Sequence, residues 1–272
     1  MGLALAALEH LKRLEAPLLR RFGRDRFYRV EVETQSRCSR GCRYCPVAVA
    51  PRPDHRMPEA LFRSIVDQLA ELGFAGRFSP HFFGEPLLDA RLPELMRYVR
   101  ASLPRATIVI YTNGDALGPD KARALLDAGV DLFLVTFEDG ESRAFRQTRA
   151  SLGWWTMRRR FVVRHFDRDV KLAFNRGGTV LFPGRELHHA SCILPTSTLV
   201  VDAWGKVKLC ANDYDGVADW GDLATERIAD VWANPAYRKL RNDVLRGRFE
   251  KAICRVCVGM EPATTPLAVY AS

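Results

Sequence analysis

The stretch Cys38-Ser-Arg-Gly-Cys42-Arg-Tyr-Cys45 decides how this chain is organised. Its three cysteines are separated by three and then two residues, and a segment rich in strand-forming residues, 27–34, leads directly into them. Three thiolates on one short loop can hold three corners of a cubane iron–sulfur cluster and leave one iron without a protein ligand. An open metal position of this kind is where a substrate or cofactor binds. The alternatives are a zinc site, which favours four ligands in close Cys-x-x-Cys pairs, or three unrelated core cysteines.

The composition is that of a globular protein with a full hydrophobic core. The chain has 272 residues, of which 47% are hydrophobic, and no apolar run approaches the roughly 20 residues that cross a bilayer. The formal charge of +9 permits an anionic partner, but the charge is spread along the chain. We therefore predict a small-molecule substrate, with no nucleic acid or membrane as a partner.

The N-terminal segment 1–26 is predicted to be a helical extension and not a signal peptide. Its leucines fall at helical spacing, while Glu9, Lys12 and Arg13 interrupt the apolar core that a signal peptide needs. Seven cysteines in a chain without a signal peptide favour a reducing cytoplasm and metal binding over disulfides.

Strands and helices alternate after the three-cysteine loop. Strands are expected at 77–83, 106–111 and 130–136, and helices at 59–73, 92–102 and 119–129. The apolar stripe of the first helix is assigned to Leu61, Ile65, Leu69 and Leu72. This alternation predicts an α/β fold with a parallel sheet and crossover helices, whose chemistry collects at the C-terminal ends of the strands.

The pattern is weaker between 141 and 185. A helix is expected at 144–152, and the pair Trp154-Trp155 is expected to pack in the protein and not to stack on a ligand. A strand at 170–174 is expected to lead into Asn175-Arg176-Gly177-Gly178.

A second set of cysteines lies in the C-terminal part of the chain. A β-hairpin is predicted over 198–210, turning near 203–206, and Cys210 ends its second strand. With Cys192 and the pair Cys254-x-x-Cys257, this makes four thiols. Four thiolates can fill all four irons of a second cubane or hold a structural zinc ion.

The first motif resembles that of the radical S-adenosylmethionine (radical SAM) superfamily. The resemblance implies that the methionine end of SAM chelates the free iron and that Tyr44 lies against the adenine. Gly84-Glu85-Pro86 resembles the Gly-Gly-Glu-Pro segment that holds the SAM amino group, with Phe83 in place of the first glycine. Asn113 is matched to a residue that bonds the ribose. A plain turn would look the same at either position.

The hairpin spacing Cys192-x(12)-Gly205-x(4)-Cys210 resembles the auxiliary-cluster domain of some superfamily members, in its short twitch/SPASM-type form. The resemblance implies a second 4Fe–4S cluster and three parts to the chain. These are the extension 1–26, a partial (β/α) radical SAM barrel at 27–185, and a small β-hairpin/α auxiliary-cluster domain at 186–272.

The segments 74–77, 81–88, 110–115 and 175–178 also resemble the family of radical SAM dehydrogenases that act on 2-deoxy-scyllo-inosamine in butirosin biosynthesis. This implies oxidation of a secondary alcohol of an aminocyclitol or sugar to a ketone by a 5′-deoxyadenosyl radical, with the auxiliary cluster accepting the second electron. A flavodoxin- or ferredoxin-type electron donor is expected.

Arg176 is then expected beside the substrate. Because arginine is practically never deprotonated, its role would be to orient the hydroxyl and stabilise oxyanion charge, and the proton-accepting base stays open. Asn212 stands where that family has a carboxylate, so the group recognised there also stays open.

Three other functions compete with this one. A carbohydrate epimerase commonly needs a free thiol to return a hydrogen atom, and the two sets of ligands use all seven cysteines, although a tyrosine could substitute. A peptide-modifying enzyme often has a leader-binding domain, for which about 25 N-terminal residues are too few. A non-catalytic metal-binding or electron-carrier protein would have no use for Gly84-Glu85-Pro86 or for an open iron.

Overall fold

The computed structural model describes residues 26–262 apart from 167–175, 181–190, 217 and 219. The strands in one sheet are β1 (Arg29–Val32), β2 (Arg77–Ser79), β3 (Thr107–Thr112), β4 (Leu132–Phe137), β5 (Phe161–His165), β6 (Thr198–Val201) and β7 (Val207–Lys208). Their order is β5-β4-β3-β2-β1-β6-β7, and the pairs are parallel except for β6 with β7. The sheet is open, with β5 and β7 at its edges. The predicted α/β class with a partial parallel barrel is confirmed.

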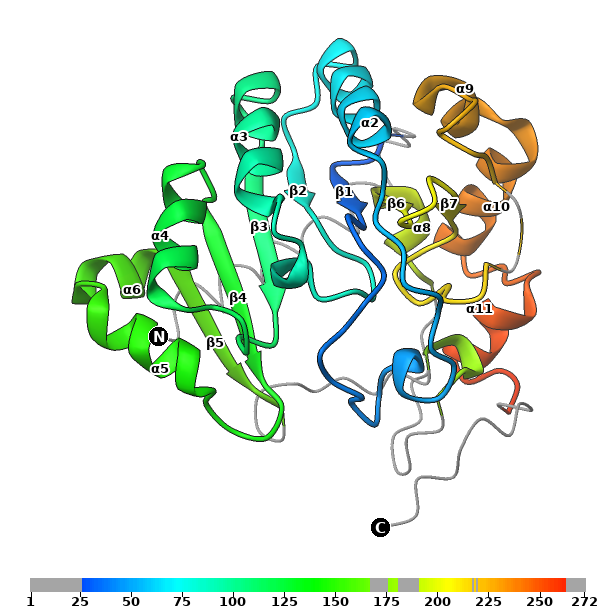
Figure 1. The fold of residues 1–272 in the computed structure, drawn as a ribbon. Helices are drawn as coiled ribbons and strands as arrows, with labels where there is room; N and C mark the ends of the chain where they lie inside the picture. The colour runs from blue at the N-terminus through cyan, green and yellow to red at the C-terminus, as the bar shows by residue number, and fades with distance from the viewer. Residues whose placement is uncertain (1–25, 167–175, 181–190, 217, 219, 263–272) are drawn as a thin grey trace.

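Helices cover the outer face of this sheet. The helices and 3₁₀ turns are η1 (Pro46–Ala48), α2 (Glu59–Glu71), η2 (Pro86–Leu88), α3 (Leu92–Ser102), α4 (Pro119–Asp127), α5 (Arg143–Ser151), α6 (Trp154–Arg160), η3 (Arg176–Gly178), α8 (Leu194–Ser197), α9 (Ile228–Ala233), α10 (Pro235–Leu245) and α11 (Ala252–Cys257). In Figure 1, α2 to α5 follow one another along the sheet, and α9 to α11 lie at its β7 end.

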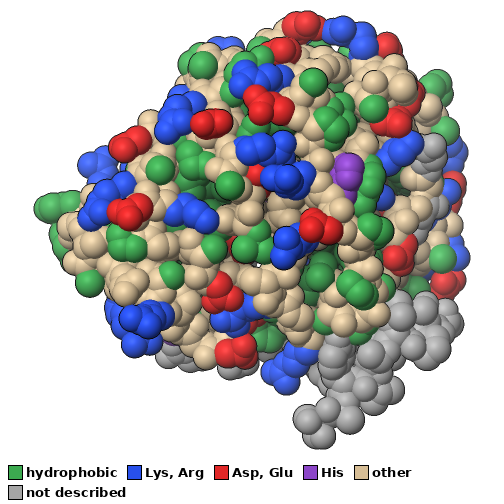
Figure 2. Space-filling model, in the orientation of Figure 1, with side chains coloured by type: hydrophobic (Ala, Val, Ile, Leu, Met, Phe, Trp, Pro, Cys, Tyr) green, Lys and Arg blue, Asp and Glu red, His purple; other side chains and the backbone are tan. Residues whose placement is uncertain are grey.

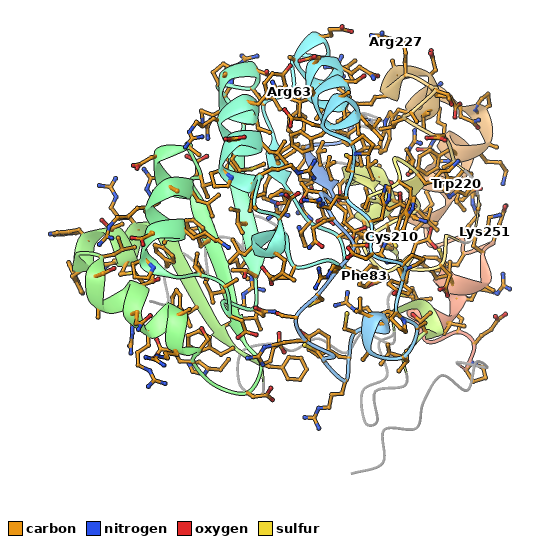
Figure 3. All side chains as sticks on the ribbon, viewed as in Figure 1. Arg63, Phe83, Cys210, Trp220, Arg227 and Lys251 are labelled. Carbon is orange, nitrogen blue, oxygen red and sulfur yellow. The ribbon has the colours of Figure 1, made fainter. Side chains whose placement is uncertain are left out.

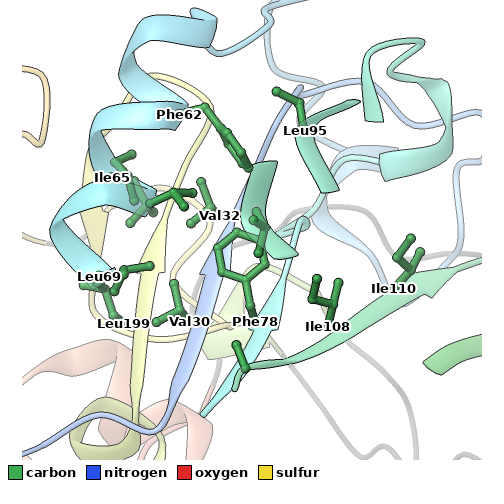
Figure 4. Close-up of a cluster of buried hydrophobic side chains, with 14 of the residues drawn as sticks. Val30, Val32, Phe62, Ile65, Leu69, Phe78, Leu95, Ile108, Ile110 and Leu199 are labelled. Atoms are coloured by element: carbon green, nitrogen blue, oxygen red, sulfur yellow. The ribbon is translucent and has the colours of Figure 1, made fainter. Parts of the chain in front are cut away.

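The main core lies between the sheet and its helices, and its part under α2 is shown in Figure 4. Val30 and Val32 of β1 point toward this helix, as does Phe78 of β2, and all three are fully buried (Figure 4). Ile65 and Leu69 of α2 meet them from the other side. Because side chains alternate along a strand, the residue between these valines faces the opposite, inner side of the sheet. β1 therefore presents Glu31 to the interior of the partial barrel.

The C-terminal hairpin continues the same sheet. β6 pairs antiparallel with β7, as predicted, and Asp202 caps the turn by accepting hydrogen bonds from the amides of Trp204 and Lys206. The other edge of β6 pairs in parallel with β1, from Arg29 opposite Thr198 to Val32 opposite Val201. The strand that leads into the three-cysteine loop and the hairpin that leads into Cys210 are therefore neighbours in one sheet.

Some expectations differ from the structure. β2 ends at Ser79 and not near 83. The chain leaves the sheet there, and the amides of Phe83 and Gly84 donate to the Glu33 side chain and not to a neighbouring strand. Trp154 and Trp155 are 61% and 69% exposed, so the prediction that they pack inside the protein is wrong. β5 and α6 were not predicted. The helix expected at 1–26 and the strand expected at 170–174 lie outside the described residues, apart from Arg26.

The surface carries charges of both signs. Figure 2 shows Lys and Arg interspersed with Asp and Glu on the viewed face, without a large patch of one sign. Within the part of the chain that the structure describes, no helix has the length and apolarity that crossing a membrane requires.

Candidate functional site

The three-cysteine loop follows β1 and is shaped by its own backbone. The amide of Cys45 donates to the carbonyl of Cys42 at 2.8 Å, and the amide of Ala48 donates to the carbonyl of Cys45 at 3.1 Å. All three thiols are free and partly buried. Burial raises the pKa of the Cys38 thiol to about 11 and that of the Cys42 thiol to about 12. Without a metal these thiols stay neutral at ordinary pH. Binding of a metal would displace their protons.

A cavity of about 700 Å³ opens beside this loop. Cys42 and Tyr44 line it from the loop, and Asp115 and Glu138 line it from the ends of β3 and β4. The Tyr44 ring stacks on Phe166 with a centroid distance of 4.4 Å and an interplanar angle of 11°. Its hydroxyl donates to Glu138 Oε1 at 2.5 Å. An aromatic pair on the wall of a roomy cavity is suited to a planar ring such as adenine.

An ion pair fastens the loop to the strand ends. Arg40 Nε lies 2.6 Å from Asp115 Oδ2, and Arg40 Nη1 lies 2.8 Å from Asp139 Oδ2. Asp115 follows β3 and Asp139 follows β4, so one arginine spans two neighbouring strands. The pair with Asp115 is the better shielded, because the Asp139 side chain is largely exposed.

Gly84-Glu85-Pro86 follows β2, from which residues 80–83 separate it. A Cβ on Gly84 would lie 2.0 Å from the carbonyl oxygen of Gln35, so only glycine allows this close approach of the chains. The Glu85 carboxylate is buried and accepts hydrogen bonds from Thr112 Oγ1 at 2.7 Å and the Asn113 amide at 3.0 Å. Both of its oxygens thus have partners within the protein, and its contact with SAM stays a prediction.

Asn113 joins the end of β3 to the three-cysteine loop. Its Nδ2 donates to Ser39 Oγ at 3.2 Å and lies 4.0 Å from Cys38 Sγ. Its Oδ1 accepts from the Asp115 amide at 2.9 Å, which is the hydrogen bond of an Asx turn. Asn113 is therefore both a turn residue and a neighbour of the loop.

The second set of cysteines surrounds a separate cavity of about 240 Å³. Cys192 precedes α8 and Cys210 follows β7, while Cys254 and Cys257 lie three residues apart on α11, a spacing that places them on one helix face. The rest of the lining is mostly apolar, including Val244, Phe249 and Ile253. Burial raises the pKa of Cys192 to about 11 and that of Cys254 to about 12.

The two sets of cysteines provide the number of thiols that two cubane clusters need. Zinc would require its sulfurs about 2.3 Å from one centre, whereas each thiolate of a cubane binds a different iron. Four thiols around one dry cavity are the donor set of a fully ligated cubane, and three on one loop are the donor set of a cubane with an open iron.

Arg176 connects the two sets of cysteines. Its Nε lies 3.4 Å from the carbonyl oxygen of Tyr44, and its Nη1 donates to Asn212 Oδ1 at 3.1 Å. Asn212 in turn directs its Nδ2 at Cys257 Sγ, 3.7 Å away, and its amide lies 3.4 Å from Cys210 Sγ. The guanidinium carbon is 5.6 Å from the centre of the Phe83 ring. Figure 3 labels Phe83 and Cys210 in this region.

Sequence reasoning missed several residues of this region. Glu33, which directly precedes the loop, is fully buried and accepts hydrogen bonds from Arg52. His81 stacks on Tyr111 with a centroid distance of 4.5 Å. Burial lowers the pKa of His81 to about 3, with a further contribution from the charges of Arg77 and Arg176. The signal available in the sequence was the occurrence of titratable residues, Glu33 and His81, within the segments 27–34 and 77–83 that were expected to form buried strands.

Comparison with known proteins agrees with the geometry. The family model of the radical SAM superfamily matches residues 32–188, and a model described as an iron–sulfur cluster-binding domain matches residues 192–258. The S-adenosyl-L-methionine-dependent 2-deoxy-scyllo-inosamine dehydrogenase of Niallia circulans is 33% identical over 234 residues, which are 85% of this chain and 92% of that protein. A GTP 3′,8-cyclase of Chlorobaculum tepidum is 35% identical over 112 residues, 41% of this chain and 32% of that protein.

Solved structures are similar as well. The crystal structure of BtrN in complex with AdoMet and 2-DOIA has a TM-score of 0.78 at 33% identity and covers 85% of this chain and 93% of that one. These matches confirm the predicted cofactors, SAM and two iron–sulfur clusters. The chain belongs to the radical SAM superfamily and is a radical SAM enzyme with a second, iron–sulfur cluster-binding domain.

Proposed function

We propose that this enzyme is a radical SAM dehydrogenase that oxidises a secondary alcohol of an aminocyclitol or sugar to a ketone, in the biosynthesis of an aminoglycoside-type natural product. The observation that carries the proposal is Arg176, which lies against Tyr44 of the first loop and bonds Asn212 beside the second set of cysteines. A substrate at Arg176 would be within reach of both redox groups. The similarity to the Niallia circulans dehydrogenase, which spans both parts of the chain, supports this function.

The proposed assignments follow from the geometry. Cys38, Cys42 and Cys45 hold the first cluster, and the four cysteines around the smaller cavity hold the second: Cys192, Cys210, Cys254 and Cys257. Tyr44, Gly84-Glu85-Pro86 and Asn113 contact SAM. The cavity beside Tyr44 supports the first of these positions. The Glu85 amide donates to the Arg37 carbonyl at 2.7 Å and Asn113 Nδ2 donates to Ser39 Oγ at 3.2 Å, and these bonds to the same loop support the other two. The partial barrel at 27–185 and the auxiliary domain at 186–272 remain our proposed division, after an extension at 1–26.

The chemistry of the two parts is complementary. When bound, SAM and the first cluster would supply the radical that removes the hydrogen atom from the carbinol carbon, and after the hydroxyl proton passes to a base the second cluster would accept the remaining electron. Arg176 binds the substrate oxygen and stabilises negative charge on it as the carbonyl forms, because a guanidinium donates without losing its own proton. The hydrogen bond from Arg176 to Asn212 fixes the orientation of the guanidinium group.

Asn212 sets the group that is recognised beside Arg176. A neutral amide offers one acceptor and two donors, whereas a carboxylate only accepts. We propose that Asn212 contacts a substrate hydroxyl and not an ammonium group. Asn212→Glu would then improve kcat/KM for a substrate that carries an amine at this point relative to one that carries a hydroxyl there.

The test is an anaerobic reconstitution of the wild type and of Cys192→Ala/Cys210→Ala. We expect about eight irons per chain in the wild type and about four in the variant. With SAM, a reductant and 2-deoxy-scyllo-inosamine deuterated at its carbinol carbons, both proteins would transfer deuterium into 5′-deoxyadenosine. The wild type alone would form the ketone. About four irons in both proteins, with zinc retained, would refute the electron-acceptor role of the second set.

The electron donor and the location belong to the same proposal. A flavodoxin- or ferredoxin-type protein would reduce the first cluster. The thiols of all seven cysteines are free in the structure, and this supports a reducing cytoplasmic location.

A further inference from the structure

Glu33 is a buried carboxylate on which three separate segments converge. It follows β1 directly and is 0% exposed. Its Oε1 accepts hydrogen bonds from the amides of Phe83 at 3.0 Å and Gly84 at 2.8 Å. Its Oε2 accepts from the amide of Ala203 at 3.1 Å. Arg52 adds a bidentate pair, with Nη2 at 2.5 Å from Oε1 and Nη1 at 2.9 Å from Oε2.

Each partner of Glu33 belongs to a different part of the proposed machinery. Arg52 lies on the loop that carries the three cysteines, between Cys45 and α2. Phe83 and Gly84 begin the segment assigned to SAM. Ala203 is in the turn of the hairpin that leads to the second set of cysteines. One carboxylate therefore sets the mutual positions of the cluster loop, the SAM-side backbone and the hairpin.

Aromatic rings enclose the cation of this pair. The Arg52 guanidinium carbon is 5.0 Å from the centre of the Tyr214 ring, 5.6 Å from that of Trp204 and 5.9 Å from that of Phe83. Tyr214 also meets the Phe83 ring edge-on at 4.8 Å, and its hydroxyl donates to the carbonyl oxygen of Ala50 at 2.5 Å. Tyr214 lies four residues after Cys210, so the auxiliary part holds the far end of the cluster loop. The ring of Phe83, which replaces the family's first glycine, completes this contact.

A buried ion pair contributes little net free energy to the stability of the fold. Desolvation of the two charges commonly offsets their attraction, and a well-packed apolar pair of the same size is often as stable. What charge-assisted, bidentate bonds add is fixed geometry. Residues behind the ligands of a metal site orient those ligands and affect affinity and activity strongly.

We propose that Glu33 and Arg52 are positioning residues that hold the three-cysteine loop in register with the SAM-binding backbone at Phe83 and Gly84. The pair would thereby keep the first cluster at a position where SAM can bind its open iron. This inference rests on the proposed assignment of that loop and that backbone to the cluster and to SAM.

The test compares three variants of the reconstituted enzyme with the wild type. Glu33→Gln/Arg52→Met removes both charges together and leaves neither one buried alone. Arg52→Lys keeps the charge but loses the bidentate fork. Arg63→Lys is the matched control, because Arg63 pairs with Glu59 on the exposed surface of α2 at 2.7 Å.

The readout is the SAM concentration at which the electron paramagnetic resonance spectrum of the reduced first cluster changes. We expect the double variant to keep its iron content and to need about tenfold more SAM, and Arg52→Lys to need an intermediate excess. The control would match the wild type. Hydrogen exchange of the segment 46–56 would rise in the double variant and in Arg52→Lys, while that of α2 would not.

The outcomes separate this inference from the proposed function. A wild type whose spectrum does not respond to SAM would refute the assignment of the first cluster. A responsive wild type with an unchanged SAM requirement in Arg52→Lys and in the double variant would overturn the positioning role, even if the melting temperature falls. If the double variant does not fold, the SAM requirement of Arg52→Lys is compared with that of Arg63→Lys, and equal requirements would overturn the positioning role.

Discussion

Gly177 places Arg176 through a turn that other residues adopt poorly. Its φ is +67°, and a Cβ there would lie 2.2 Å from Ile253 Cγ1 on α11. The left-handed conformation costs an L-residue about 1–2 kcal/mol, and the clash adds to that cost. We expect Gly177→Ala to lower the free energy of unfolding by more than about 2 kcal/mol, because α11 or Arg176 must move.

The measurement is denaturant unfolding, followed by the rate of ketone formation. Gly153→Ala is the control, because Gly153 has a negative φ and a Cβ added there would meet no atom within 4 Å. An equal loss of stability in both variants would show that the turn at Gly177 is not the cause.

His81 predicts how stability depends on pH. Its Nδ1 is buried without a hydrogen bond, and burial lowers its pKa to about 3, against about 6.5 in the unfolded chain. Below pH 6.5 the unfolded state therefore binds a proton that the folded state refuses, so stability falls as the pH falls. Between about pH 7.5 and pH 5.5 this loss amounts to at most about 1.4 kcal/mol.

The variant His81→Phe isolates this contribution. It cannot take a proton, and it keeps a ring for the stack on Tyr111. We expect urea unfolding of the variant to lose less stability than the wild type over the same pH range. Parallel pH curves for the two proteins would contradict a buried neutral His81.

At the residue level, sequence patterns pointed to the cysteines more clearly than to the residues that support them. The structure brings the cysteines together as one loop, 38–45, and one cavity lining, and their roles as ligands stay a prediction, as do the SAM contacts of Tyr44 and Asn113. Glu33 gave no such signal, since its partners Phe83 and Ala203 are 50 and 170 positions away. The carboxylate of Glu85 likewise has a partner, Thr112, that only the folded sheet brings near.

At the scale of elements, α2 shows what periodicity can and cannot define. The helix runs over Glu59–Glu71, close to the predicted 59–73, but its buried stripe is rotated. Phe62, Ile65, Val66 and Leu69 are buried, at spacing i, i+3, i+4 and i+7. Leu72 is 50% exposed, because it follows the last turn of the helix. Of the predicted stripe, Ile65 and Leu69 are buried and Leu61 is partly buried against the core, so the prediction was wrong at Leu72.

The different burial of Ile65 and Leu72 predicts unequal costs for two similar truncations. Ile65 is fully buried against the sheet, so Ile65→Ala should lower the free energy of unfolding by about 2–5 kcal/mol. Leu72→Ala removes an exposed side chain and should change it by about 0.5 kcal/mol or less. Urea unfolding of the two variants measures the difference, and equal costs would contradict the exposed position of Leu72 at the end of α2.

β5 and α6 were missed for a related reason. None of the seven residues of α6 is buried, so no apolar period marks the helix. The five residues of β5 include Arg164 and His165, which break the apolar run expected of a buried strand. Its pairing with β4, from Phe133 opposite Phe161 to Phe137 opposite His165, is a long-range contact that local patterns do not contain.

For the whole molecule, the feature that sequence patterns could not supply is the parallel pairing of β1 with β6. It joins Arg29 to Thr198 and makes one sheet from β1, which leads into the three-cysteine loop, and the β6–β7 hairpin, which leads into Cys210. The β6–β7 hairpin was predictable from its turn. The pairing of β6 with β1 was not. Leu199 and Val201 of β6 belong to the same hydrophobic core as Val30 and Val32 of β1.

This shared core predicts that the barrel part does not fold alone. A fragment 1–190 would lose β6 and leave the edge of β1 and its core valines uncovered. An exposed strand edge above an incomplete core favours aggregation. We expect the fragment to show no cooperative urea transition by circular dichroism and to elute as an aggregate, and coexpression with 191–272 to restore a soluble complex. A fragment that unfolds cooperatively with the free energy of the full chain would mean that the two parts are independent domains, and that the pairing of β1 with β6 contributes little to holding them together.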